Sequence, residues 1–296
     1  MRKWTSAMVA IAIMGMAGCT VTDVSEKKVI TANDDWPVQE QGREQPKEKS
    51  GEIIEFEHRV EGYDKEHANE YDTKRKVMMD LDKEPYEDPH ILTEEEIADT
   101  SKVLVNKYNR LPDGYVPADL IDVPSSGENG IVQMRKEAGE AFKRLVNWAK
   151  GQGMTLNACS AFRTAEYQEK LWNNGKATGG EDYADKWWTR PSHSEHQTGL
   201  AVDIRLNNDT SDLDAVRNQH GYDTLLKNLA EFGFILRYPD DGKDTTLIEP
   251  ESWHLRYVGK ETAKEIAEKG ITFEQFIADE KLEDLYKDFP DEIARG

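Results

Sequence analysis

The sequence predicts an α+β fold, with a mainly antiparallel sheet flanked by helices in one folded domain behind a disordered N-terminal tether. Helical patterns come first in the second half of the chain, and short strands bracketed by helices follow, without internal repeats. The first third is different, because residues 20–100 hold 24 Asp and Glu against 11 Lys and Arg and few aromatic residues. Such a segment cannot bury enough apolar surface to fold alone. We expect residues 19–95 to be an acidic tether and residues 96–296 to fold; a small helper segment docked on the domain is the alternative.

Residues 1–18 have the pattern of a secretory signal. A positive start is followed by an uncharged apolar run, Ala7–Ala17, which is far shorter than the roughly 20 residues that span a bilayer. The run ends at Met16-Ala-Gly-Cys19, which resembles the lipobox of bacterial lipoproteins. The resemblance implies cleavage before Cys19 and a lipid on its sulfur, which would anchor the chain to the outer face of the cytoplasmic membrane. An ordinary cleaved signal with an incidental cysteine is the alternative. If Cys19 carries the lipid, Cys159 is a lone thiol, and we expect it to be a buried apolar filler rather than a nucleophile.

The clearest helix lies between Ile131 and Gly151. Its apolar positions Ala138, Phe142, Leu145 and Ala149 are spaced by four, three and four residues, which places them on one face, and Gly151 ends the pattern. Farther along, Thr164 is well placed to cap a helix. The other elements we expect are an extended entry over 104–117, a strand over 154–161, a helix over 165–172, a loop over 175–190, strands over 200–204, 234–238 and 253–258, and helices over 222–232, 261–269 and, capped by Thr272, 273–286.

Two histidines and one aspartate form a candidate metal site. His196 precedes Asp203 by seven residues, and His254 follows in a second apolar strand, with Glu251 three residues before it. Two imidazoles and a carboxylate suit a catalytic zinc, which takes three protein ligands and keeps one position for water, while Glu251 is placed to handle the proton of that water. Taken singly, each residue is more often a hydrogen-bonded aspartate or a satisfied polar histidine.

Three blocks of sequence resemble the VanY-type D-alanyl-D-alanine carboxypeptidases. These are Ser160–Arg163, Ser194–Asp203 and Glu251–Gly259, in matching order, and the resemblance extends from about Leu104 to Gly259. That family consists of zinc enzymes that trim peptidoglycan stem peptides, including relatives that act on L,D bonds. The resemblance implies that one Zn²⁺ is held by His196, Asp203 and His254, and that Glu251 is the general base and acid. It also implies that Arg163, Gln168 and Ser194 hold the terminal residue of the substrate and its carboxylate.

The sequence departs from the family pattern at two places. Ser192 stands where glycine is usual, and His193 beside it is a possible extra ligand. Ser252 replaces a usual proline before the tryptophan, which leaves Glu249 as a less favoured alternative to Glu251 as the base.

Several side chains have two possible roles. Arg163 suits a substrate carboxylate, because guanidinium binds carboxylate in a fork and the helix after Thr164 adds a favourable dipole; a salt bridge, for instance to Glu166, is the alternative. Trp253 is expected to line the wall of the substrate pocket, and core packing is the alternative. Trp187 and Trp188 either line a substrate rim or cover the core.

Composition limits the possible partners. The formal net charge is −20, which argues against nucleic acid. The site residues, together with the resemblance to the VanY-type enzymes and to the lipobox, imply a membrane-tethered zinc carboxypeptidase that acts on peptidoglycan stem peptides. An endopeptidase with the same zinc site is the first alternative, although a carboxylate-binding Arg163 favours the exopeptidase. A wall-binding lipoprotein that has lost catalysis is the second, and the presence of all four site residues weighs against it.

Overall fold

The site is built on a sheet of four antiparallel strands. In the computed structural model, which describes residues 68–98, 101–127 and 130–288, the strands lie in the order β5 (Leu156–Ser160), β6 (Ala201–Leu206), β8 (Glu251–Tyr257) and β7 (Phe234–Tyr238). All three pairings are antiparallel. The predicted α+β class with a mainly antiparallel sheet is therefore confirmed.

Two smaller sheets accompany this one, and neither was predicted as such. Strands β3 (Leu120–Val123) and β4 (Val132–Arg135) pair in antiparallel fashion, whereas the two-residue strands β1 (His90–Ile91) and β2 (Asn109–Arg110) pair in parallel. Because residues 132–135 belong to β4, the helix expected from Ile131 begins only at Lys136. An alternating pattern of buried and half-buried residues in β4 marks it as a strand.

Helix α3 (Lys136–Gly151) supplies the largest amphipathic face. Its four predicted inward residues, Ala138, Phe142, Leu145 and Ala149, have no exposed surface. The helix packs against β3, β4 and β5, so one face of it joins the small hairpin to the main sheet. The other elements are α6 (Tyr222–Asn228), α7 (Lys243–Thr246), α8 (Lys260–Lys269), α9 (Phe273–Asp288) and the 3-10 turns η1 (Glu195–Thr198), η2 (Leu213–Asn218) and η3 (Leu229–Phe232).

The prediction of a loop over residues 175–190 is wrong. Helix α4 (Ala165–Gly179) runs on through its start, and a second helix, α5 (Glu181–Trp187), fills most of the rest. Acidic residues in the first turn of α5 and a lysine in its last turn complement the helix dipole. Gly180, at φ 88°, makes the sharp corner between the two helices. Thr164 caps α4 as predicted, with its hydroxyl accepting from the Tyr167 backbone N–H at 3.2 Å.

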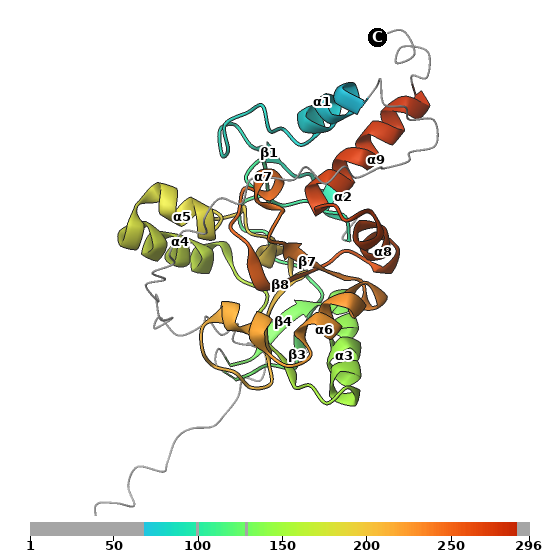
Figure 1. The fold of residues 1–296 in the computed structure, drawn as a ribbon. Helices are drawn as coiled ribbons and strands as arrows, with labels where there is room; N and C mark the ends of the chain where they lie inside the picture. Colours follow the sequence, from blue (N-terminus) through green and yellow to red (C-terminus); the bar gives the residue numbers. More distant parts are fainter. Residues whose placement is uncertain (1–67, 99–100, 128–129, 289–296) are drawn as a thin grey trace, which may run out of the picture. The chain divides into compact units, whose positions relative to one another are not determined.

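Part of the expected tether is folded. Residues 68–98 form α1 (Ala68–Met78), β1 and α2 (Glu94–Ala98), so order begins well before residue 96. Arg75 of α1 forms an ion pair with Asp279 of α9 at 2.7 Å, and the two helices lie side by side (Figure 1). Leu92 and Ile97 enter the main core. The acidic composition of residues 68–98 gave no sign that Leu92 and Ile97 are buried in the core. The predicted signal segment, Cys19 and the tether up to residue 67 lie outside the described residues.

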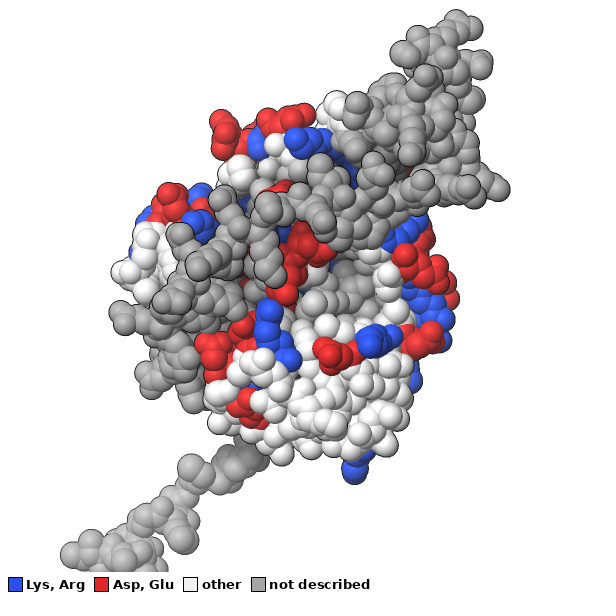
Figure 2. Space-filling view, viewed as in Figure 1, with Lys and Arg blue, Asp and Glu red and all other residues white. Residues whose placement is uncertain are grey.

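The core lies between the sheet and its helices, whereas the surface carries mixed charge. One large cluster of buried apolar side chains joins α2, α3 and the strands β5, β6 and β8, and a second cluster lies under α8 and α9. On the face seen in Figure 2, acidic and basic side chains both occur, among uncharged ones. One exposed ion pair joins Lys264 to Glu231 at 2.8 Å. Exposed pairs of this kind add little stability, so the core holds the fold. Among the described helices, none is long and apolar enough to span a bilayer.

Candidate active site

The pairing of strands brings two of the predicted metal ligands together. Asp203 of β6 and His254 of β8 are direct partners in the antiparallel ladder. His196 reaches them from the 3-10 turn η1, which ends at Gly199 in the left-handed conformation, φ 72°. A Cβ atom at Gly199 would also lie 3.2 Å from the backbone nitrogen of Arg135. Glycine is therefore required at this position, because it turns the chain from η1 into β6 where β4 approaches closely.

The three side chains converge on one point. The Oδ1 atom of Asp203 lies 3.4 Å from Nε2 of His196 and 3.3 Å from Nδ1 of His254. All three residues are at most 3% exposed. Two donors bound to one zinc ion at about 2.0–2.2 Å in a tetrahedron would be roughly 3.3–3.6 Å apart, so the observed spacing fits. Asp203 Oδ1 is also buried without a hydrogen-bond partner, which is costly for a carboxylate unless a cation lies beside it.

Each imidazole ring is oriented by a contact on the nitrogen that does not face Asp203. Nδ1 of His196 lies 2.7 Å from the carbonyl oxygen of Ala161, which can only accept, so this nitrogen carries the proton and Nε2 presents a lone pair. Nε2 of His254 lies 3.3 Å from the Glu195 carboxylate, which leaves Nδ1 directed at Asp203. Hydrogen bonds of this kind to the far nitrogen are typical of histidines that bind a metal.

Burial and neighbouring charges set the protonation of the group. Burial lowers the pKa of His196 to about 4. Burial alone would raise the pKa of Asp203, but the charges of His196 and Arg163 outweigh it and hold that pKa well below its usual value. For His254, burial is outweighed by the carboxylates of Asp203, Glu195 and Glu251, so its pKa is raised. Because a metal ligand must present a free lone pair, cation binding at Nδ1 of His254 would compete with protonation of that nitrogen.

Glu251, rather than Glu249, lies beside the ligands. Its Oε2 atom is 3.3 Å from Nδ1 of His254, and burial raises the pKa of its carboxyl. Glu249 instead pairs with Lys243 at 2.6 Å, and its backbone N–H donates to the Lys186 carbonyl. A general base must lie within reach of the water that it deprotonates, so the geometry favours Glu251 over Glu249 as the base.

Arg163 borders the same cluster. Its Nη2 atom contacts Asp203 and its Nε atom donates to the Ser160 hydroxyl at 2.8 Å, so Glu166, the alternative partner, is not the one it uses. In the described part of the chain, its Nη1 atom forms no hydrogen bond. Gln168 is buried and donates to the Thr189 carbonyl at 2.8 Å, while its Oε1 atom has no partner.

The remaining predicted residues lie farther from the cluster or have other partners. Ser194 is buried directly before η1, and its hydroxyl does not cap that turn. Trp253 is half-buried and packs against the main core, which favours the packing alternative. Trp188 covers Gly175 between α4 and α5, where a Cβ atom would meet its ring at 2.6 Å. Nδ1 of His193 lies 2.8 Å from the carbonyl oxygen of Asn106, so His193 supports the 106–109 turn and does not join the ligand group.

A set of buried charged residues behind His254 was missed. Glu195 and Glu274 face Arg237 and Arg256, and all four side chains are at most 2% exposed. The signal was present in the sequence, because arginines stand inside the predicted apolar strands 234–238 and 253–258. A charge in a buried strand requires a partner, and Glu195 directly precedes a predicted ligand.

Comparison with known proteins agrees with this geometry. Residues 131–260 match the VanY family, described as D-alanyl-D-alanine carboxypeptidase. The bifunctional D-Ala-D-Ala dipeptidase and carboxypeptidase VanXYC of Enterococcus gallinarum is 32% identical over 177 residues, which cover 58% of this chain and 91% of that protein. The chain belongs to the VanY family. The VanY match contains all four predicted residues of the metal cluster, His196, Asp203, Glu251 and His254.

Other VanY-type relatives and their structures extend the comparison. The putative carboxypeptidase YodJ of Bacillus subtilis is 39% identical over 178 residues, which are 58% of this chain and 65% of that protein, or slightly less than two thirds of its length. The structure of the LD-carboxypeptidase LdcB is 36% identical, with a TM-score of 0.58 over 64% of this chain and 89% of that one. A vancomycin-resistance D,D-pentapeptidase in complex with Zn(II) is 32% identical, with a TM-score of 0.51, and the match covers 60% of this chain and 98% of that one. Relatives of this chain are thus carboxypeptidases, and one of them holds zinc.

Proposed function

We propose that the protein is a zinc-dependent carboxypeptidase that removes the C-terminal D-alanine from peptidoglycan stem peptides. The observation that carries the proposal is the convergence of His196, Asp203 and His254, with an unpartnered carboxylate oxygen among them and Glu251 at 3.3 Å from His254. When bound there, Zn²⁺ would supply an activated water near neutral pH and a positive charge for the developing oxyanion.

Glu251 would carry the proton in both halves of the reaction. Its carboxylate takes a proton from the attacking water, and the resulting carboxylic acid gives that proton to the amine of the departing D-alanine. Burial raises the pKa of Glu251, which makes the carboxylate a stronger base than an exposed glutamate. The 3.3 Å distance between its Oε2 atom and Nδ1 of His254 supports this role, because a water on a metal ion bound by His254 would be within its reach.

Arg163 and Gln168 would hold the end of the substrate. Arg163 has an Nη1 atom without a partner in the described chain and a side chain that is only 14% exposed, so a carboxylate bound there would be largely shielded from solvent. A charge-assisted hydrogen bond in such surroundings selects a free C-terminus. The unpartnered Oε1 atom of Gln168 is an acceptor for an N–H group, and Ser194 supplies a hydroxyl near His196.

The direct test is digestion of defined stem peptides. Zinc-loaded protein is incubated with a pentapeptide that ends in D-Ala-D-Ala and with a tetrapeptide that ends in a single D-Ala, and product masses are recorded. We expect the loss of one alanine, and the peptide that loses it distinguishes D,D from L,D cleavage. Release of internal fragments only would point to an endopeptidase and overturn the proposal.

Two matched variants identify the base. Glu251→Gln is expected to lower kcat by roughly 100- to 10,000-fold while the protein still binds zinc, because a general base contributes about that much. Glu249→Gln, two residues away and paired with Lys243, is expected to behave like the wild type. A wild-type protein that binds stem peptide and zinc but hydrolyses no more than Glu251→Gln would be a wall-binding protein instead.

We also propose that the enzyme is anchored outside the cytoplasmic membrane through a lipid on Cys19. The support is the sequence Met16-Ala-Gly-Cys19 after a short apolar run. Two acyl chains give stable attachment, whereas one gives only reversible binding. Cys19→Ser should move the protein from the membrane to the soluble fraction and abolish incorporation of labelled fatty acid. Unchanged fractionation would contradict the anchor.

A further inference from the structure

The buried carboxylate of Glu195 lies directly behind the metal ligand His254. Its Oε2 atom is 3.3 Å from Nε2 of the imidazole, on the side opposite the other ligands. Its Oε1 atom accepts from Nε of Arg237 at 2.8 Å and from Nη1 of Arg256 at 3.3 Å. A carboxylate held on both oxygens has little freedom, so the direction in which it accepts from His254 is fixed.

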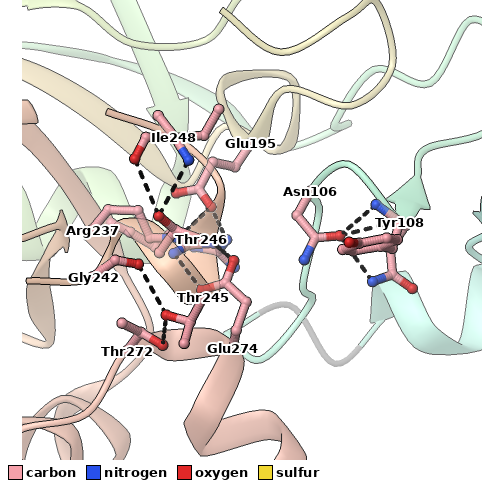
Figure 3. Close-up of polar contacts among 12 residues, drawn as sticks. Asn106, Tyr108, Glu195, Arg237, Gly242, Thr245, Thr246, Ile248, Thr272 and Glu274 are labelled. Carbon is pink, nitrogen blue, oxygen red and sulfur yellow. Dashed lines mark hydrogen bonds and ion pairs between the residues drawn. The ribbon is translucent and has the colours of Figure 1, made fainter. Parts of the chain in front are cut away.

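Arg237 connects Glu195 to the C-terminal helix α9. Its Nη1 and Nη2 atoms donate to the two oxygens of Glu274 at 2.8 and 2.5 Å, while its Nε atom is used on Glu195. All three guanidinium nitrogens are therefore engaged, and Figure 3 shows Arg237 between the two glutamates. Two-point pairing of arginine with carboxylate fixes orientation as well as distance.

The position of Glu274 is itself fixed by the start of α9. Thr272 caps this helix by accepting from the backbone N–H of Gln275 at 3.3 Å, and its hydroxyl accepts from that of Thr245 at 3.0 Å (Figure 3). Phe273 is fully buried, with its ring 5.6 Å from the guanidinium carbon of Arg237 and 5.0 Å from that of Arg256. Helix α9 thus enters the space behind the site with a defined register.

The chain of contacts continues outside the family-matched segment at both ends. Glu274 follows residue 260, where the VanY match ends, and Arg256 donates through Nη2 to the carbonyl of Val103, which precedes residue 131. The set is balanced in charge, with two arginines and two glutamates, all of them buried. Removing one member would leave an uncompensated charge, and the remaining groups would have to rearrange.

We propose that Glu274 of α9 is a positioning residue for the metal centre, acting through Arg237 and Glu195 on the imidazole of His254. The inference rests on the proposed zinc site and adds to it a support that the matched segment does not contain. Glu195 keeps the Nε2–H tautomer of His254, so that Nδ1 faces Asp203. Glu274 keeps Arg237 from turning away from Glu195. Mutation of a residue that hydrogen-bonds directly to a metal ligand, as Glu195 does to His254, typically changes metal affinity by roughly 10- to 100-fold.

The test measures zinc affinity, by competition with a chromogenic chelator, in three single variants of the full chain. Glu195→Gln is expected to weaken zinc binding roughly 10- to 100-fold, because its amide can donate to His254 and favour the wrong tautomer. Glu274→Gln is expected to weaken it less, by at least about threefold, because Glu274 reaches His254 only through Arg237 and Glu195. Asp279→Asn is the matched control, because it lies on the same helix and breaks the ion pair with Arg75.

Unfolding midpoints and kinetics separate positioning from general destabilisation. Glu274→Gln and Asp279→Asn are both expected to lower stability, but only Glu274→Gln should lower zinc affinity. At saturating zinc, KM should stay within about twofold of wild type, since groups that bind substrate are untouched. Equal zinc affinity in Glu274→Gln and Asp279→Asn would overturn this inference alone, provided that the wild type binds zinc and trims the peptide. A wild type that binds no zinc would overturn both this inference and the proposed function.

Discussion

The role of Arg163 leads to a prediction with a defined size. Arg163 donates to Ser160 at 2.8 Å and contacts Asp203, and its Nη1 atom remains for a substrate carboxylate. A hydrogen bond between charged groups is worth about 1.5–3 kcal/mol, and about 1.4 kcal/mol corresponds to a tenfold change in rate. Arg163→Gln should therefore lower kcat/KM for a stem peptide with a free C-terminus by roughly 10- to 150-fold beyond any loss on its amidated form.

The assay is a cycle of two enzymes and two substrates. Wild type and Arg163→Gln are each measured on the free acid and on the C-terminal amide of one stem peptide. Because Arg163 also contacts Asp203, the variant can disturb the metal ligands, and that effect would slow both substrates by the same factor. A difference confined to the free acid supports carboxylate recognition. An equal loss on both substrates would refute the reasoning and leave Arg163 as a partner of Asp203 only.

Three further outcomes are expected. Ser192→Gly should raise the free energy of unfolding by up to about 1 kcal/mol in chemical denaturation, because Ser192 adopts φ 66°, where a side chain is strained. Glu251→Gln should raise the melting temperature of the zinc-free protein at pH 7, because it removes a buried carboxylate. Burial raises the pKa of Glu251 in the folded protein above its unfolded value of 4.5. The protonated carboxyl therefore contributes stability below pH 4.5, and this contribution is lost as the pH rises through the folded-state pKa. The difference in melting temperature between Glu251→Gln and the wild type should accordingly shrink toward pH 4.5. His193→Gln should leave zinc affinity unchanged in competition titrations, since His193 faces Asn106; a clear loss would restore it as a ligand.

The sequence was informative where periodicity or a long motif was strong. The four inward residues of α3 and the strand that carries Asp203 followed from spacing alone, and both are found. Helix α5 and strands β3 and β4 were missed because they are short, from four to seven residues. Elements of this length depend on what they pack against, and α5 packs against α4.

The folded part of the expected tether was missed for a different reason. Residues 68–98 are acidic on average, but a few positions, among them Arg75, Leu92 and Ile97, make contacts with distant parts of the chain. Arg75 pairs with a residue 204 positions away. An average over composition cannot detect contacts that arise only when the C-terminal helix is in place.

The same limit applies to the site. His196, Asp203, Glu251 and His254 could be named because their blocks resemble a known family, whereas Glu195 and Arg237 could not be paired in advance. Their contact spans 42 positions, and the contact of Arg237 with Glu274 spans 37. Contacts between residues so far apart in sequence are fixed by sheet register and by the docking of α9, neither of which local patterns determine.

Sheet register therefore decides whether the site exists at all. Asp203 faces His254 across one rung of the β6–β8 ladder, and Ser160, which holds Arg163, faces Asp203 across β5–β6. Because side chains alternate faces along a strand, a slip of one residue would turn Asp203 away from both histidines. Arg256, two residues after His254 on β8, points to the same side and ties that strand to Glu195 and Val103. The buried charges behind the predicted metal ligands thus oppose any other alignment of the strands, and the same contacts carry the orienting role that we propose for them at His254.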